Sequence, residues 1–127
     1  MHVVDTCGWI EWLTDGRLTS DFAPFLIDSA NLVVPTLVQY ELYKWCLRER
    51  DEAAALTVIG ITEACQVKPL DTHTALSAAE FSAVHKLAMA DAIVYATAIA
   101  CGGELMTSDA HFAGLPRVRY WRKEPAT

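Results

Sequence analysis

The segment His2-Val3-Val4-Asp5-Thr6 places an acidic residue directly after a short apolar run. A second segment of this kind, Leu105-Met106-Thr107-Ser108-Asp109, lies near the other end of the chain. Short apolar runs that end at turn-forming or capping residues are typical of buried strands. Both segments therefore predict a strand that is followed at once by a carboxylate.

Helical and extended patterns alternate around these two segments. We expect strands at residues 3–4, 32–34, 66–70, 104–107 and 118–121, and helices at residues 6–13, 20–28, 35–50, 51–64, 72–85 and 90–102. Strands separated by helices predict a three-layer α/β/α fold with a central, mainly parallel sheet of about four to five strands. We expect residues 1–127 to form one such domain.

Two further acidic residues, Glu41 and Asp91, lie in apolar sequence of helical character. Burying a carboxylate is costly unless it is paired, hydrogen-bonded or bound to a metal ion. In parallel sheets, sites lie beyond the carboxyl ends of the strands, where Asp5 and Asp109 are expected. We therefore expect these four carboxylates to form one shared site that a hard divalent cation neutralises.

Each acid also has a purely structural interpretation. Asp5, Asp91 and Asp109 stand where a carboxylate can cap or stabilise the start of a helix. Glu41 could be an exposed helical position. The two interpretations are compatible, because a capping carboxylate keeps a free oxygen. Glu11, two turns after Asp5, is a further candidate for the rim of the site.

The composition restricts the class of protein. At 53% hydrophobic and 20% charged residues, the chain is globular rather than disordered. No apolar run has the length of a membrane span, and the N-terminal segment has no signal-peptide pattern, so we expect a cytoplasmic protein. Four widely spaced cysteines without a Cys-x-x-Cys pair predict buried free thiols rather than disulfides or a zinc site.

The charge distribution bears on nucleic-acid binding. A net charge of −6 argues against non-specific binding through the whole surface, although an acidic metal site accounts for part of that charge. The tail from Arg117 to Lys123 is locally basic, and two interpretations stay open for it: a solvated edge strand, which we favour, and an RNA contact. We expect His111 at the surface.

The aromatic residues of two helices are expected in the core or at a partner interface rather than as a base-stacking platform. These residues are Trp9, Trp12, Tyr43 and Trp45.

In order and context, the four acids resemble those of PIN-domain ribonucleases and, within that family, the VapC toxins of VapBC toxin–antitoxin pairs. Four segments that span nearly the whole chain carry the resemblance: Val3-Val4-Asp5-Thr6, Val34-Pro35-Thr36-Leu37-Val38-Gln39-Tyr40-Glu41-Leu42, Lys86-Leu87-Ala88-Met89-Ala90-Asp91-Ala92, and Leu105-Met106-Thr107-Ser108-Asp109 with Phe112. The chain departs from the family pattern at Cys7, where a small polar residue is common, and at Ala88, where a serine is common. These departures bring the hydrogen bonding around the acids into question, but not the acids themselves.

The resemblance implies a PIN-like fold and a metal-dependent endoribonuclease that acts as the toxin of a type II toxin–antitoxin pair. Asp5, Asp91 and Asp109 would be the principal ligands of Mg²⁺ or Mn²⁺, and Glu41 a ligand or the group that positions the attacking water. Thr6 and Thr107 would orient the carboxylates through hydrogen bonds.

The resemblance also implies partners. These are a VapB-like antitoxin that delivers an arginine to the acids, a single-stranded or looped RNA substrate, and a second copy of the chain. We expect the copies to meet through the apolar helices at residues 37–46 and 56–61. The alternatives are an aspartyl-phosphate receiver or phosphatase, which also has an aspartate after its first strand, and a non-catalytic interaction module. The aspartyl-phosphate alternative lacks its usual second acid here, since Thr6-Cys7 follows Asp5. In the interaction module, the acids would be helix caps and the aromatic helices would bind a partner.

Overall fold

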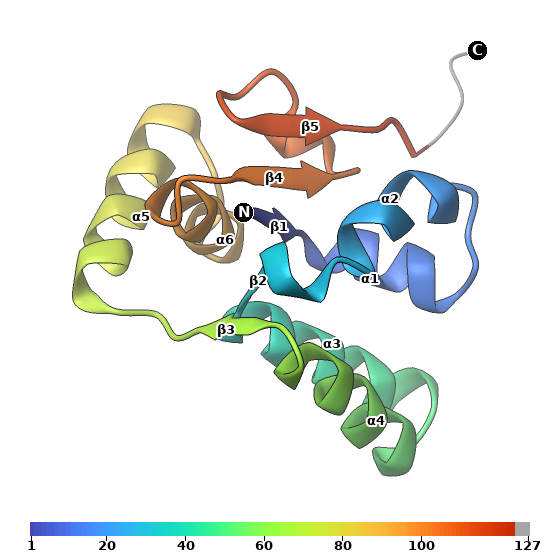
Figure 1. The fold of residues 1–127 in the computed structure, drawn as a ribbon. Helices are drawn as coiled ribbons and strands as arrows, with labels where there is room; N and C mark the ends of the chain where they lie inside the picture. Colours follow the sequence, from blue (N-terminus) through green and yellow to red (C-terminus); the bar gives the residue numbers. More distant parts are fainter. Residues whose placement is uncertain (124–127) are drawn as a thin grey trace.

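A parallel sheet forms the centre of the protein (Figure 1). The structure is a computed structural model that describes residues 1–123. The five strands run in the spatial order β3-β2-β1-β4-β5, and all neighbouring pairs are parallel. Their bounds are β1 (His2–Val4), β2 (Leu32–Pro35), β3 (Gln66–Lys68), β4 (Glu104–Thr107) and β5 (Val118–Tyr120). Because the strands are parallel, all five carboxyl ends open at one edge of the sheet.

Six α-helices connect the strands and pack in pairs on them. Their bounds are α1 (Thr6–Leu13), α2 (Thr19–Leu26), α3 (Thr36–Glu49), α4 (Glu52–Glu63), α5 (Thr72–His85) and α6 (Met89–Ala100), with two short 3₁₀ turns, η1 (Ser29–Asn31) and η2 (Ala110–Phe112). The chain moves outward from β1 to β2 and β3, and then returns through α5 and α6 to β4 on the other side of β1. Crossovers of one hand therefore place α5 and α6 on the face opposite to the earlier helices, and the predicted three-layer α/β/α fold is confirmed.

The predicted elements are all present, with small shifts at their ends. The second helix begins at Thr19 and ends at Leu26, and β3 ends at Lys68 rather than at residue 70. Pro35 was expected in the first turn of α3. It instead ends β2 and caps α3, because its ψ of 142° is extended rather than helical. Residues 124–127 of the expected domain lie outside the described residues.

Apolar strands and one face of each helix form the core. Trp9, Phe22, Tyr95 and Phe112 are its largest buried side chains. Of the four aromatic residues expected in the core or at a partner interface, Trp9 is buried in the core, and Trp12, Tyr43 and Trp45 pack against the core while partly exposed. All four cysteines are free thiols, but only Cys46 is buried.

Among residues 1–123, no single helix is long and apolar enough to cross a bilayer. Helices α5 and α6 reach that length and apolarity only when taken together, and they are bent by 116° with respect to each other.

Candidate metal centre

Asp5 stands at the carboxyl end of β1 and begins α1. Its Oδ1 accepts the backbone N–H of Thr6 at 2.9 Å, so the carboxylate is the N-cap of the helix. Its Oδ2 accepts the hydroxyl of Thr107, the last residue of β4, at 3.0 Å. With only 7% of its surface exposed, Asp5 lies at the base of the site. Asp5 therefore caps α1 and at the same time lies at the site.

Asp109 lies two residues beyond β4 and is tied to the same threonine. Its backbone N–H donates to Thr107 Oγ1 at 2.9 Å, and its Oδ1 accepts the backbone N–H of His111 at 2.9 Å, which caps η2. Thr107 thus links the two acids that follow neighbouring strands. The predicted orienting role of Thr107 rests on this pair of hydrogen bonds.

Asp91 comes to Asp109 from the first turn of α6. His111 Nδ1 lies 2.9 Å from Asp109 Oδ1 and 3.8 Å from Asp91 Oδ2. Ligand atoms of these three residues all lie within 4.8 Å of one another, a spacing that one metal ion can bridge. The imidazole is exposed, as the sequence predicted, but it lies against two of the acids. Its position two residues after Asp109 was the signal available in the sequence.

The Glu41 carboxylate, which belongs to α3, contacts the first residue of α1. The hydroxyl of Thr6 donates to Glu41 Oε1 at 2.6 Å, so one side chain connects α3 to the residue next to Asp5. The second oxygen of Glu41 makes no hydrogen bond within residues 1–123. That oxygen is available to a cation or to a water molecule.

The electrostatics of the site show that the acids lie within reach of one another. Burial raises the pKa of Asp5 to about 6, with the negative charges of Asp91 and Glu41 adding to the rise and the hydrogen bonds from Thr107 and Thr6 opposing it. Burial also raises the pKa of Asp91, with Asp109 and Glu41 adding to it and His111 opposing it. Ionised together, the four carboxylates repel. A divalent cation removes that repulsion, and carboxylate oxygens are the donors that Mg²⁺ and Mn²⁺ prefer, so the residues fit such an ion.

The two departures from the family pattern have different consequences. The Cys7 thiol lies 3.6 Å from Asp5 Oδ2 and 3.5 Å from Thr107 Oγ1, and it accepts the backbone N–H of Ser108 at 3.4 Å. Burial raises its pKa to about 11, so the thiol stays protonated and makes these contacts as a weak polar group. Ala88, by contrast, is the N-cap of α6 and supplies no side-chain hydrogen bond there.

Glu11 does not join the four acids. It is buried, and its Oε2 accepts the backbone N–H of Leu18 at 3.1 Å, so it stabilises the turn between α1 and α2. The structure thus brings Asp5, Glu41, Asp91 and Asp109 together at one edge of the sheet and adds Cys7 and His111, which the sequence pattern did not select.

Comparison with known proteins supports the same fold. The family model described as PIN domain matches residues 2–118. A toxin–antitoxin complex from Klebsiella pneumoniae superposes with a TM-score of 0.80 at 19% identity, over 94% of this chain and 96% of that chain. DNA-bound VapBC from Salmonella typhimurium superposes with a TM-score of 0.75 at 16% identity, over 94% and 96% of the two chains.

A third similar structure is VapC20 from Mycobacterium tuberculosis, described as a sarcin–ricin loop cleaving toxin. It superposes with a TM-score of 0.76 at 16% identity, over 93% of this chain and 97% of that one. Identities this low establish a common fold. A comparison with curated protein sequences gave no match.

Proposed function

Because this chain belongs to the PIN-domain family, we propose that it is a metal-dependent endoribonuclease that hydrolyses RNA phosphodiester bonds. One observation carries the proposal: four carboxylates from four separate segments meet at the carboxyl edge of the sheet, with hydrogen bonds from Thr6 and Thr107 that hold them in place. The similarity in fold to a toxin described as cleaving the sarcin–ricin loop supports the choice of substrate.

Each side chain of the site has its own role in the proposed hydrolysis. When bound, Mg²⁺ or Mn²⁺ would supply an acidified water molecule and neutralise charge on the phosphate. Asp5, Asp91 and Asp109 would hold the cation, directly or through water. Thr6 fixes Oε1 of Glu41, which leaves Oε2 to bind the cation or to accept a proton from the attacking water.

His111 belongs to the same side of the site as Asp91 and Asp109. Its Nδ1 lies against Asp109 Oδ1, where it either orients that carboxylate or adds a nitrogen ligand. Either role holds Asp109, which follows β4, in a fixed position relative to Asp91 of α6. Substrate RNA reaches this recessed edge most easily as a single strand or loop.

We also propose that the protein is the toxin of a type II pair, acts in the cytoplasm and is inhibited by a VapB-like antitoxin. Its fold neighbours include a toxin–antitoxin complex and a VapBC complex. A guanidinium group of the antitoxin would bridge two of the carboxylates with paired hydrogen bonds and occupy the position of the cation. This predicts that an Arg→Ala change in the antitoxin tail weakens inhibition.

A homodimer is the third part of the proposal. Exposed apolar side chains gather on the two helices expected to form the interface, where Tyr40 and Tyr43 of α3 and Ile59 of α4 line one groove. Leu56 is 55% exposed on the outer side of α4. Exposed apolar surface of this kind marks an interaction site.

Cleavage of RNA by the purified protein tests the activity directly. We expect cleavage with Mg²⁺ or Mn²⁺ and none with a chelator. Asp5→Asn and Asp91→Asn should each abolish cleavage, because a ligand charge is lost while the volume is kept. Asp51→Asn is the matched control, since Asp51 caps α4 away from the site and asparagine is an equally good cap.

Two results would contradict the proposal. Full cleavage by either site variant at matched metal concentration would show that the acids are not the site. Phosphorylation of Asp5 by a small phosphodonor, without RNA cleavage, would favour an aspartyl-phosphate receiver.

A further inference from the structure

Positive charge is concentrated on one side of this acidic protein. Five of its ten lysine and arginine residues lie in β5, in the residues that flank it or in the turn between α1 and α2: Arg17, Arg117, Arg119, Arg122 and Lys123. Strand β5 is parallel to β4, so the residues that follow it emerge at the edge that carries the four acids. We call Trp121–Lys123 the C-terminal strap.

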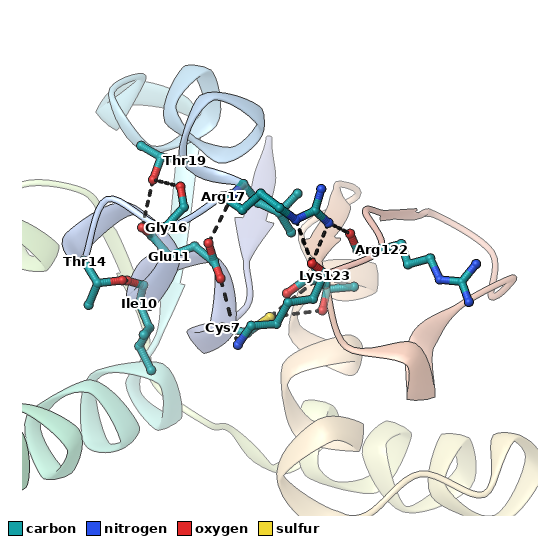
Figure 2. Close-up of polar contacts among 12 residues, drawn as sticks. Cys7, Ile10, Glu11, Thr14, Gly16, Arg17, Thr19, Arg122 and Lys123 are labelled. Atoms are coloured by element: carbon teal, nitrogen blue, oxygen red, sulfur yellow. Dashed lines mark hydrogen bonds and ion pairs between the residues drawn. The ribbon is translucent and has the colours of Figure 1, made fainter. Parts of the chain in front are cut away.

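The backbone of the strap is fixed against the rest of the fold. Trp121 donates its backbone N–H to the carbonyl of Thr107 at 3.0 Å, next to the hydroxyl that holds Asp5. Arg17 donates from Nε to the carbonyl of Lys123 at 2.9 Å and from a terminal nitrogen to the carbonyl of Arg122 (Figure 2). The expected solvated edge strand is confirmed, since β5 is the last strand of the sheet and is largely exposed. The residues that follow it are held in place by Arg17.

Aromatic packing gives the strap a second anchor. The Trp121 ring lies 5.2 Å from the Phe22 ring, which belongs to the buried core. The Arg119 guanidinium lies 5.4 Å from the Trp121 ring and 5.2 Å from the Phe25 ring. Arg119 thus lies on aromatic rings, and the strap begins at a residue that packs on the core.

The two basic side chains of the strap, Arg122 and Lys123, are exposed. Figure 2 shows the Lys123 amine directed toward Glu11, and the Arg122 side chain extended away from this contact. Lys123 Nζ lies 3.9 Å from Glu11 Oε1, but its side chain is 62% exposed. The lysine end of this pair is exposed and the 3.9 Å separation is long for an ion pair, so the amine can exchange Glu11 for a phosphate. Within residues 1–123, the Arg122 guanidinium makes no hydrogen bond or ion pair.

We propose that the C-terminal strap is the phosphate-binding rim of the site, and that Lys123 and Arg122 bind backbone phosphates of RNA on either side of the cleaved bond. The inference rests on the proposed function. An acidic cluster on a protein of net charge −6 repels a polyanion, so the substrate needs fixed cations beside the carboxylates. Contacts to phosphates position the strand without reading its sequence.

Kinetics and salt dependence with a labelled single-stranded RNA of mixed sequence test the inference. For Lys123→Gln and Arg122→Gln we expect KM to rise about 5- to 20-fold each, with kcat unchanged, because a phosphate contact contributes to binding and not to the chemical step. The slope of log binding constant against log salt concentration should fall by about 0.7 for each lost contact. Lys123→Arg should keep the wild-type slope, because it keeps the charge.

Two further variants separate this role from a structural one. Arg48→Gln removes an exposed charge of α3 that, within residues 1–123, pairs only with its neighbour Glu49, and it should leave KM and the salt slope as in the wild type. The double variant Lys123→Gln/Glu11→Gln should bind RNA as weakly as Lys123→Gln alone. Recovery of binding in the double variant would mean that Lys123 serves only to neutralise Glu11, and would overturn the inference.

The failure of the inference and the failure of the proposed function give different results. If the wild type cleaves RNA and the strap variants keep its KM and salt slope, the strap is not the phosphate rim and the nuclease activity stands. If the wild type shows no metal-dependent cleavage, the proposed function fails, and the inference fails with it.

Discussion

The hydroxyl of Thr107 lies 3.0 Å from Asp5 Oδ2, although the two residues are 102 positions apart in the sequence. The same hydroxyl accepts the backbone N–H of Asp109 at 2.9 Å. One side chain at the end of β4 therefore fixes the carboxylate after β1 relative to the one after β4. This relationship depends on the pairing of β1 with β4 in parallel register.

Replacing Thr107 should uncouple the two acids. Thr107→Val keeps the shape but removes the hydroxyl, which leaves the Asp109 N–H without its partner and should lower the free energy of unfolding by about 1–3 kcal/mol. We expect RNA cleavage to fall at least roughly tenfold, because misplaced ligands bind the cation less well. Thr107→Ser, which keeps the hydroxyl, is the control for both measurements. Equal cleavage by the valine and serine variants would show that the hydroxyl is not needed.

The raised pKa of Asp5 predicts how stability depends on pH without metal. Folding favours the protonated carboxyl, since its pKa rises from 3.8 to about 6 on folding. The ionised carboxylate therefore begins to destabilise the fold as the pH rises above 3.8, and the full cost, about 3 kcal/mol, is present above about pH 6.

Asp5→Asn should remove that cost. In chelator, the variant should exceed the wild type in free energy of unfolding at about pH 7, and the difference should disappear at about pH 4. Urea unfolding at both values measures this. A variant that is less stable than the wild type at neutral pH would show that the Asp5 carboxylate is stabilised by its hydrogen bonds more than it is penalised by burial.

Metal binding should release protons. A divalent cation favours the ionised form of Asp5 and of Asp91, whose pKa values are raised without metal. Calorimetric titration with Mn²⁺ at about pH 6, in two buffers of different ionisation enthalpy, should show proton release that declines toward about pH 8. The metal should also raise the Tm of the wild type but not that of Asp5→Asn. An equal rise in both proteins would place the cation elsewhere.

Two glycines in helices predict opposite effects of the same substitution. A Cβ on Gly8 of α1 would lie 2.6 Å from Val4 Cγ1 and 2.8 Å from Phe22 Cδ1, both in the buried core. Gly8→Ala should therefore destabilise the protein by about 1–3 kcal/mol through overpacking. A Cβ on Gly60 of α4 has nothing within 4 Å, so Gly60→Ala should stabilise it by about 0.5–1 kcal/mol. Urea unfolding of both variants measures the contrast, and a neutral Gly8→Ala would mean that α1 shifts away from β1 without cost.

Oligomeric state tests the proposed dimer interface. We expect light scattering to report a dimer at tens of micromolar, roughly where a micromolar interface is occupied. Leu56→Glu places a charge on the exposed side of α4 and should give a monomer if that helix is covered in the dimer. Ala53→Glu, at an exposed position in the first turn of the same helix, is a control for the added negative charge. A monomeric wild type would exclude this part of the proposal.

The sequence by itself determined the order of strands and helices and the identity of the four acids. Short apolar runs that end at a carboxylate, such as His2-Val3-Val4-Asp5, specify both a buried strand and the residue at its carboxyl end. These signals are local, because hydrophobic periodicity and capping act within a few residues. The predicted start of the third helix, at Pro35, was one residue too early. Local signals do not decide this position, because a proline suits both the end of a strand and the start of a helix.

Only the tertiary structure decided how the site is supported. The bond from Thr6 to Glu41 joins α1 to α3, and the contact of Arg17 with the C-terminal strap joins residues 105 and 106 positions apart. His111 was placed at the surface by its sequence, but it reaches Asp91 only because η2 and α6 meet at the same edge. Long-range contacts of this kind depend on strand order and register, which no local pattern specifies. The sequence therefore selected the charged residues, and the packing of distant segments decided which of them meet.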